Sequence, residues 1–290
     1  MAPLSCHSTL TPEETLDHPT LLCHMETNEK NDAVLAVTAD LAGILNASVI
    51  GIAACQPIQI FAEAPYAGDL VQADISEIRR ETKATEQVFR TYLDGRANHL
   101  SFRSAASYQE LADYIVGQSR AADFIVTAPD IGGVLFGETR RTNIGDLVMN
   151  AGRPVILAPT GTTECRLNHA VIAWKDSREA RRAVADALPI LRHASKVTVV
   201  EITRQADWDN AVQRTNDVAA WMLGHDIAAS LLVKAHDGSD AECLYGMLDE
   251  ENCDFLVAGA YGRSRIGEWM FGGVTTDLLL SPDRCTMVSH

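Results

Sequence analysis

The residues best suited by type and spacing to bind a ligand lie near the C-terminus. Four glycines with the spacing G-x2-G-x9-G-G follow the apolar run Phe255–Ala258; they are Gly259, Gly262, Gly272 and Gly273. Glycine lets a backbone turn tightly and bring its N–H groups close to a phosphate, and the start of a helix favours an anion. Arg263 and Arg265 add positive charge. The segment predicts a site for a phosphate-bearing ligand, and the alternative is a tight connection needed only for packing.

Motifs for nucleophilic or metal-assisted catalysis do not occur in the sequence. There is no G-x-S-x-G, G-x-x-x-x-G-K-[S/T] or H-E-x-x-H pattern, so we assign no catalytic residue and do not expect a dedicated enzyme. Cys6-His7 and Cys23-His24 lack a further pair at zinc spacing, so no metal site is predicted. The seven cysteines, an odd number without a close C-x-x-C pair, are typical of a reducing compartment.

The overall charge narrows the range of partners. The 290 residues include 24 Lys and Arg against 39 Asp and Glu, a formal net charge of −15. Such a surface repels phosphate backbones and anionic lipids, so we expect neither nucleic acid nor membrane as a partner. The N-terminus has no basic start followed by an apolar stretch, and no apolar run reaches the roughly 18 residues of a membrane span. We expect a cytoplasmic protein.

The chain carries an internal repeat. Asp123–Val126 recurs 131 residues later as Asp254–Val257, and Arg153 recurs at the same offset as Arg284. Near the start of each copy, Thr20–Cys23 matches Ala170–Ala173, an offset of 150. The shared order predicts two copies of one domain, residues 1–159 and 160–290, joined through a polar segment that begins at residue 160.

Within each copy, strand and helix patterns alternate. Ala170–Trp174 is a short apolar run typical of a strand buried on both faces, and Ser177 is a candidate N-cap for a helix that reaches Leu191. Pro189 is expected to kink or shorten this helix. The same reasoning predicts strands at 197–202, 230–233, 255–258 and 285–288, and helices at 206–223, 241–250 and 273–280. The alternation indicates a doubly wound α/β domain with a parallel sheet.

The glycine spacing after a strand that ends in Val-Ala resembles the ATP-binding signature of the universal stress protein family. Two further segments resemble the family's first strand with its loop and its closing helix with the last strand; they are 173–180 and 145–155. The resemblance covers nearly the whole chain as two tandem domains. It implies the adenine nucleotide alpha hydrolase-like fold, with Val155–Leu157 and Thr286–Val288 paired across a pseudo-twofold axis as in an internal dimer.

The resemblance also implies a set of residues that bind ATP. Ala173, Trp174 and Lys175 would lie near the base and ribose, with Ile202 beside the base. The residues that would surround the phosphates are Ala258, Gly259, Gly262, Arg263, Gly272, Gly273, Val274 and Thr275.

Two positions depart from the family pattern. Gly273 stands where Ser or Thr is usual, which removes a hydroxyl near the phosphates or Mg²⁺, and Lys175 stands at the position of an Asp that bonds ribose hydroxyls. The first copy departs further. It has no glycines at the loop positions, which fall on Ala128, Ile131, Arg141 and Thr142, and its Asp position falls at Met25. We expect no ATP in the first copy.

We therefore predict a universal stress protein that binds ATP, with or without Mg²⁺, through its second domain, with at most weak ATP hydrolysis and with a role in stress response. Two alternatives remain open. One is a stress-response scaffold that binds no nucleotide and acts through protein partners, and association into a homodimer is possible in either case. The other is an ATP-using enzyme of the PP-loop type, against which Lys175–Arg178 counts because a Ser- and Gly-rich loop would be expected there.

Overall fold

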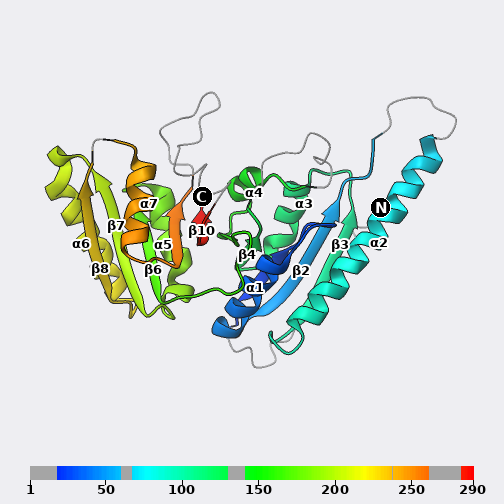
Figure 1. The fold of residues 1–290 in the computed structure, drawn as a ribbon, viewed down its shortest axis with the longest axis horizontal. Coiled ribbons are helices and arrows are strands. Elements are labelled where there is room, and N and C mark those ends of the chain that lie inside the picture. Colours follow the sequence, from blue (N-terminus) through cyan, green and yellow to red (C-terminus); the bar gives the residue numbers. More distant parts are fainter. Residues whose placement is uncertain (1–17, 60–66, 130–140, 237, 261–281) are drawn as a thin grey trace, which may run out of the picture.

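The computed structural model describes residues 18–59, 67–129, 141–236, 238–260 and 282–290. They form one ten-stranded sheet in the order β3-β2-β1-β4-β5-β10-β9-β6-β7-β8 (Figure 1). The strands of the first half are β1 (Thr20–His24), β2 (Ser48–Cys55), β3 (Leu100–Ala106), β4 (Phe124–Thr127) and β5 (Val155–Leu157). Those of the second half are β6 (His169–Trp174), β7 (Lys196–Thr203), β8 (Ala229–Ala235), β9 (Phe255–Gly259) and β10 (Cys285–Ser289).

Helices cover both faces of the sheet, as the predicted doubly wound fold requires. One face packs against α1 (Asp32–Leu45), α2 (Ala67–Leu93), α5 (Arg178–Leu191) and α6 (Trp208–Leu223). The other packs against α3 (Leu111–Gln118), α4 (Ile144–Asn150) and α7 (Asp240–Glu250). Short 3₁₀ turns at Ser119–Ala121 and Gln205–Asp207 precede β4 and α6. None of the helices in the described ranges combines the length and apolarity of a membrane span.

The strands and helices predicted in the second half are confirmed within two residues at each end, apart from the helix expected at 273–280, which lies outside the described residues. Ser177 is the N-cap of α5, since its hydroxyl accepts from the backbone N–H of Ala180 at 3.2 Å. Pro189 lies in the last turn of α5, which ends two residues later at Leu191. A proline there removes only one late hydrogen bond.

The two halves join through β5 and β10, which pair with each other as predicted and run antiparallel. Thr286, Met287 and Val288 face Leu157, Ile156 and Val155 in register. All other neighbouring strands in the sheet are parallel. Because every residue of β5 is buried, this pairing places an apolar seam in the middle of the sheet.

The strand register corrects the offset of the repeat. Leu21 pairs with Phe124, and Ala170 pairs with Phe255, so the first strands are equivalent at an offset of 149 rather than 150. The counterpart of Lys175 is therefore Glu26, and the expectation that it is Met25 was wrong. Strands buried on both faces have no alternation of polar and apolar residues, so their sequence does not fix which residue faces which side.

Candidate ligand site at the carboxyl ends of the second half

The order of strands changes direction between β6 and β9. From β6 the chain proceeds outward to β7 and β8 and then returns to the other side of β6 to form β9 and β10. Ligands of doubly wound sheets bind beyond the carboxyl ends of the strands at such a switch point. Ala173 pairs with Ala258 at this position, so the sheet brings together two of the residues predicted to bind the ligand. The corresponding switch point of the first half lies between β1 and β4.

The other predicted residues at the ends of β6 and β7 do not all lie on one face of the sheet. Ile202, near the end of β7, packs in the same apolar cluster as Ala173 and Ala258, on the face covered by α7. Trp174 ends β6, faces α5 and α6, and is buried. Lys175 follows it and is exposed, so its ammonium group is accessible to an anion at the edge of the sheet.

Gly259, the last residue of β9, has a packing reason to be glycine. A Cβ at this position would lie 2.5 Å from the backbone nitrogen of Ala180 and 2.7 Å from the carbonyl carbon of Glu179. The first turn of α5 therefore rests directly on the end of β9, and only a residue without a side chain allows this approach. Close packing thus explains the first glycine of the motif, whatever it does toward a ligand.

The start of α5 already holds an anionic side chain. Glu179 is buried in its first turn, and Arg178 donates to it at 3.1 Å. Burial alone would raise the pKa of Glu179, but hydrogen bonds from its own backbone N–H and from Ser177, together with the charge of Arg178, hold that pKa below its usual value. Asp176 forms an ion pair with Arg181. The N-terminus of α5 is therefore satisfied by the protein's own carboxylates.

A buried carboxylate that sequence reasoning missed lies on β7. Glu201 pairs in register with Trp174, and its Oε1 accepts from Nε of Arg214 in α6 at 3.1 Å. Arg214 also binds Asp207 at 2.8 Å, and these two carboxylates raise the pKa of Arg214. The hydrogen bonds from Arg214 and Asn210 lower the pKa of Asp207. The signal available in the sequence was a glutamate, the one charged residue of the predicted strand 197–202.

The equivalent place in the first half is filled by a polar cluster. His24 ends β1 and is 2% exposed; its Nδ1 lies 2.7 Å from the hydroxyl of Thr127 on β4, and its Nε2 lies 3.2 Å from the hydroxyl of Thr142. The backbone N–H of Thr142 donates to Glu26 at 2.9 Å, and the side chain of Arg141 binds Glu29. These contacts tie the segment after β1 to the start of the chain leading into α4 and close the switch point between them.

His24 is expected to make folding depend on pH. Burial lowers the pKa of His24 below 6.5, an effect opposed by the charge of Glu26. The unfolded chain therefore takes up a proton near pH 6.5 that the folded protein does not, and stability falls as the pH drops through this range, by up to about 1.4 kcal/mol per pH unit. Urea unfolding of wild type and His24→Asn between pH 7.5 and 5.5 should give a shallower dependence in the variant. Equal slopes would contradict this role of His24.

Six predicted phosphate-binding positions cannot be compared with the structure. Gly262, Arg263, Gly272, Gly273, Val274 and Thr275 lie outside the described residues. In the part of the chain that is described, no cluster of three or more His, Cys, Asp or Glu side chains could hold a metal ion. The phosphate loop remains a prediction from the sequence.

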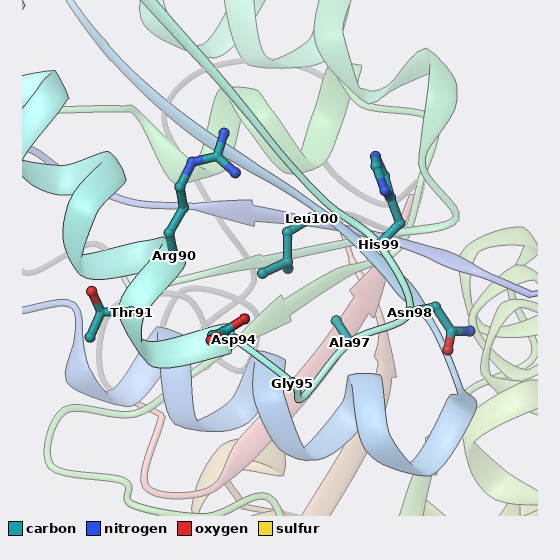
Figure 2. A pocket seen from close by; sticks show the side chains of 8 residues that line it. All are labelled: Arg90, Thr91, Asp94, Gly95, Ala97, Asn98, His99 and Leu100. Atoms are coloured by element: carbon teal, nitrogen blue, oxygen red, sulfur yellow. The ribbon is translucent and has the colours of Figure 1, made fainter.

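A hollow of about 630 Å³ lies away from this site, at the turn between α2 and β3 (Figure 2). Arg90 from α2 and His99 ahead of β3 stand on either side of Leu100, and Asp94 lies at the turn. Arg90 is already paired with Glu86 at 2.8 Å. The hollow opens at the amino end of β3, whereas the predicted residues lie at the carboxyl ends of β6, β7 and β9.

Comparison with known proteins identifies the fold. No family model and no curated protein matches the sequence. Among solved structures, a universal stress protein from Archaeoglobus fulgidus matches with a TM-score of 0.72 at 11% identity, over 94% of this chain and 99% of that one. A Pseudomonas aeruginosa protein named as a candidate universal stress protein matches with a TM-score of 0.59 at 12% identity, over 94% and 93%. A P. aeruginosa protein of unknown function gives 0.55 at 12% identity, over 94% and 92%.

These matches span both halves of the sheet, since each covers nearly the full length of both chains being compared. All three TM-scores exceed 0.5, so the matched chains share the overall fold of this one. The chain therefore has the fold of the universal stress proteins, as the resemblance in its sequence predicted.

Proposed function

We propose that the chain is a universal stress protein that binds an adenine nucleotide, ATP with Mg²⁺, in its second half and uses this binding in a cytoplasmic stress response. One contrast between the halves carries the proposal. At the switch point of the first half, the paired positions are His24 and Thr127, which bond to each other. At that of the second half they are Ala173 and Ala258. At these two positions the second half has only methyl side chains, whereas the imidazole and the hydroxyl of the first half fill the site.

The chemistry of the surrounding residues suits a nucleotide. Ala173 is partly exposed and Ile202 is half-buried, so an apolar surface is available to a base at the strand ends. Lys175 supplies a positive charge for a phosphate. Thr142 of the first half, whose hydroxyl contacts His24, corresponds at the repeat offset of 131 to Gly273, which has no side chain. The hydroxyl that helps to fill the site in the first half therefore has no counterpart in the second half.

In this proposal the first half is a structural or regulatory partner that does not bind ATP. Its His24 cluster stands where the ligand lies in the second half, and the β5–β10 seam makes the two halves one sheet. Five cysteines of the described residues form no disulfide, which fits a reducing compartment such as the cytoplasm; they are Cys23, Cys165, Cys243, Cys253 and Cys285.

The test is to count nucleotides. We expect mass spectrometry of the denatured protein and ATP–Mg²⁺ titration calorimetry to give about one adenine nucleotide per chain. Two per chain would show that the first half also binds. None, with no heat of binding, would favour the scaffold that acts through protein partners.

A charge in the loop should abolish this binding. Gly262→Asp is expected to weaken ATP binding by about a hundredfold or more, because a carboxylate repels the phosphates and a side chain keeps the backbone from approaching them. Calorimetry with Gly43→Asp is the matched control, since Gly43 is an exposed residue of α1 with open space beside it. Undiminished binding by Gly262→Asp would refute the site.

A further inference from the structure

Two buried polar atoms at the carboxyl end of the second half, on side chains of neighbouring strands, have no hydrogen-bond partner among the described residues. They are the indole Nε1 of Trp174 and the carboxylate Oε2 of Glu201. Trp174 is 8% exposed and Glu201 4%. Leaving such a group without a partner destabilises the folded protein, and a charged group does so more than a neutral one. Such groups therefore call for a partner outside the described part of the chain.

The two side chains lie on the same side of the sheet. Trp174 and Glu201 are register partners on the parallel strands β6 and β7, which lie about 4.8 Å apart in a sheet. Register partners on parallel strands point to one face. Trp174 packs in the cluster that contains Val199, and Glu201, two residues further along β7, reaches Arg214 of α6 on that face. The two side chains are therefore neighbours on the face of the sheet that α5 and α6 cover.

The chemistry of the two atoms defines the partner that they need. An indole N–H only donates, and a carboxylate oxygen only accepts. A group that bridges them must accept a hydrogen bond at one point and donate one at another, which a hydroxyl does. Arg214 binds Oε1 of Glu201, which leaves Oε2 as the oxygen that needs a donor.

The first half shows that the fold itself does not need this pair. The strand register gives an offset of 149 residues between β1 and β6 and of 148 residues between β2 and β7. The counterparts of Trp174 and Glu201 are therefore Met25 and Ala53. Both are buried and apolar, with exposed fractions of 1% and 0%. The same position in the sheet is thus satisfied by an apolar pair, at a lower cost than two unpartnered polar groups. The polar pair is specific to the half that we propose to bind a ligand.

We propose that Trp174 and Glu201 together bind a hydroxyl of the ligand, with the indole N–H donating to its oxygen and the carboxylate accepting its proton. This inference rests on the nucleotide binding proposed above, because a ribose supplies the hydroxyls of an adenine nucleotide. The pair would then distinguish ribonucleotides from their deoxy forms.

The experiment compares ATP with 2′-deoxy-ATP and 3′-deoxy-ATP by calorimetry. We expect wild type to bind one of the deoxy analogues roughly tenfold to hundredfold more weakly than ATP, the effect of one hydrogen bond to a charged group. Glu201→Gln should lose this discrimination, because Arg214 keeps the amide oxygen and leaves the NH₂ group facing the hydroxyl. Asp207→Asn is the matched control: it removes the other carboxylate on Arg214 and should keep the discrimination.

The outcomes separate the two proposals. If wild type binds ATP and both deoxy analogues equally, the inference is overturned while nucleotide binding stands. If wild type binds no ATP, both fail. Should Glu201→Gln not fold, as judged by circular dichroism, Trp174→Phe removes only the donor and should reduce the discrimination in the same way. In wild type, the indole N–H resonance of Trp174, identified by its loss in Trp174→Phe, should shift with ATP and remain in place with the weaker analogue. An unshifted resonance on saturation with ATP would also overturn the inference.

Discussion

Gly259→Ala is expected to destabilise the protein by about 2–3 kcal/mol, as an overpacked core position does. The added Cβ would lie 2.5 Å from the nitrogen and 3.0 Å from the Cα of Ala180, and both atoms belong to the backbone of α5. If the clashing atoms belonged to a side chain, that side chain could rotate away. The backbone atoms at the start of α5, which Ser177 caps, can move only together with the helix. Urea unfolding followed by circular dichroism measures the loss.

Gly246→Ala is the matched control for this substitution. Gly246 lies in the middle of α7 with no atom within 4 Å of an added Cβ, so the same change should stabilise the protein by about 0.5–1 kcal/mol through helix propensity. If Gly259→Ala were as stable as wild type, α5 would not rest on β9 as described. The first glycine would then be explained by the approach of a ligand alone.

The sequence was sufficient for most of the second half because its strands and helices have distinct local patterns. Continuous apolar runs indicated β6 and β9, and the hydroxyl of Ser177 three residues before Ala180 marked the start of α5. The β5–β10 pairing followed from the family resemblance, and its antiparallel register is seen in the structure. These features depend on residues close in the chain or on a strong fold-level likeness.

The polar clusters could not be predicted because their members are far apart in sequence. His24 and Thr142 are separated by 118 positions, and no local pattern links a histidine at the end of one strand to a threonine ahead of a distant helix. The one-residue error in the repeat offset had a similar cause, since strands buried on both faces do not reveal their register. It obscured the equivalence of His24 with Ala173, on which the contrast between the halves depends.

Glu201 illustrates a signal that was present in the sequence. A charged residue in an apolar strand needs a partner, and Arg214, 13 residues later, supplies it for one oxygen only. The sequence did not show that Trp174 would lie beside it, because this follows from the pairing of β6 with β7. The residues of the glycine segment beyond Ala260 stay as predictions.

Filling the switch point of the second half with the same two side chains that fill it in the first half should abolish nucleotide binding. We expect the double variant Ala173→His, Ala258→Thr to weaken ATP binding by about a hundredfold or more, which is about 2.7 kcal/mol. The imidazole and hydroxyl would form the pair that His24 and Thr127 form at 2.7 Å in the first half, and they would fill the space proposed for the ligand. Because that pair is compatible with the sheet in one half, we expect the variant to fold, as circular dichroism would show.

Ala220→His is the control for the added side chain, since Ala220 is exposed on α6 and away from the strand ends. It should bind ATP as wild type does. The reverse variant, His24→Ala with Thr127→Ala, should leave ATP binding by the second half unchanged. The strands β5 and β10 lie between the two switch points, of which one is formed by β1 and β4 and the other by β9 and β6. A closed variant that folds and still binds ATP with wild-type affinity would show that the alanines are not where the nucleotide lies. The contrast between the halves would then reflect packing alone.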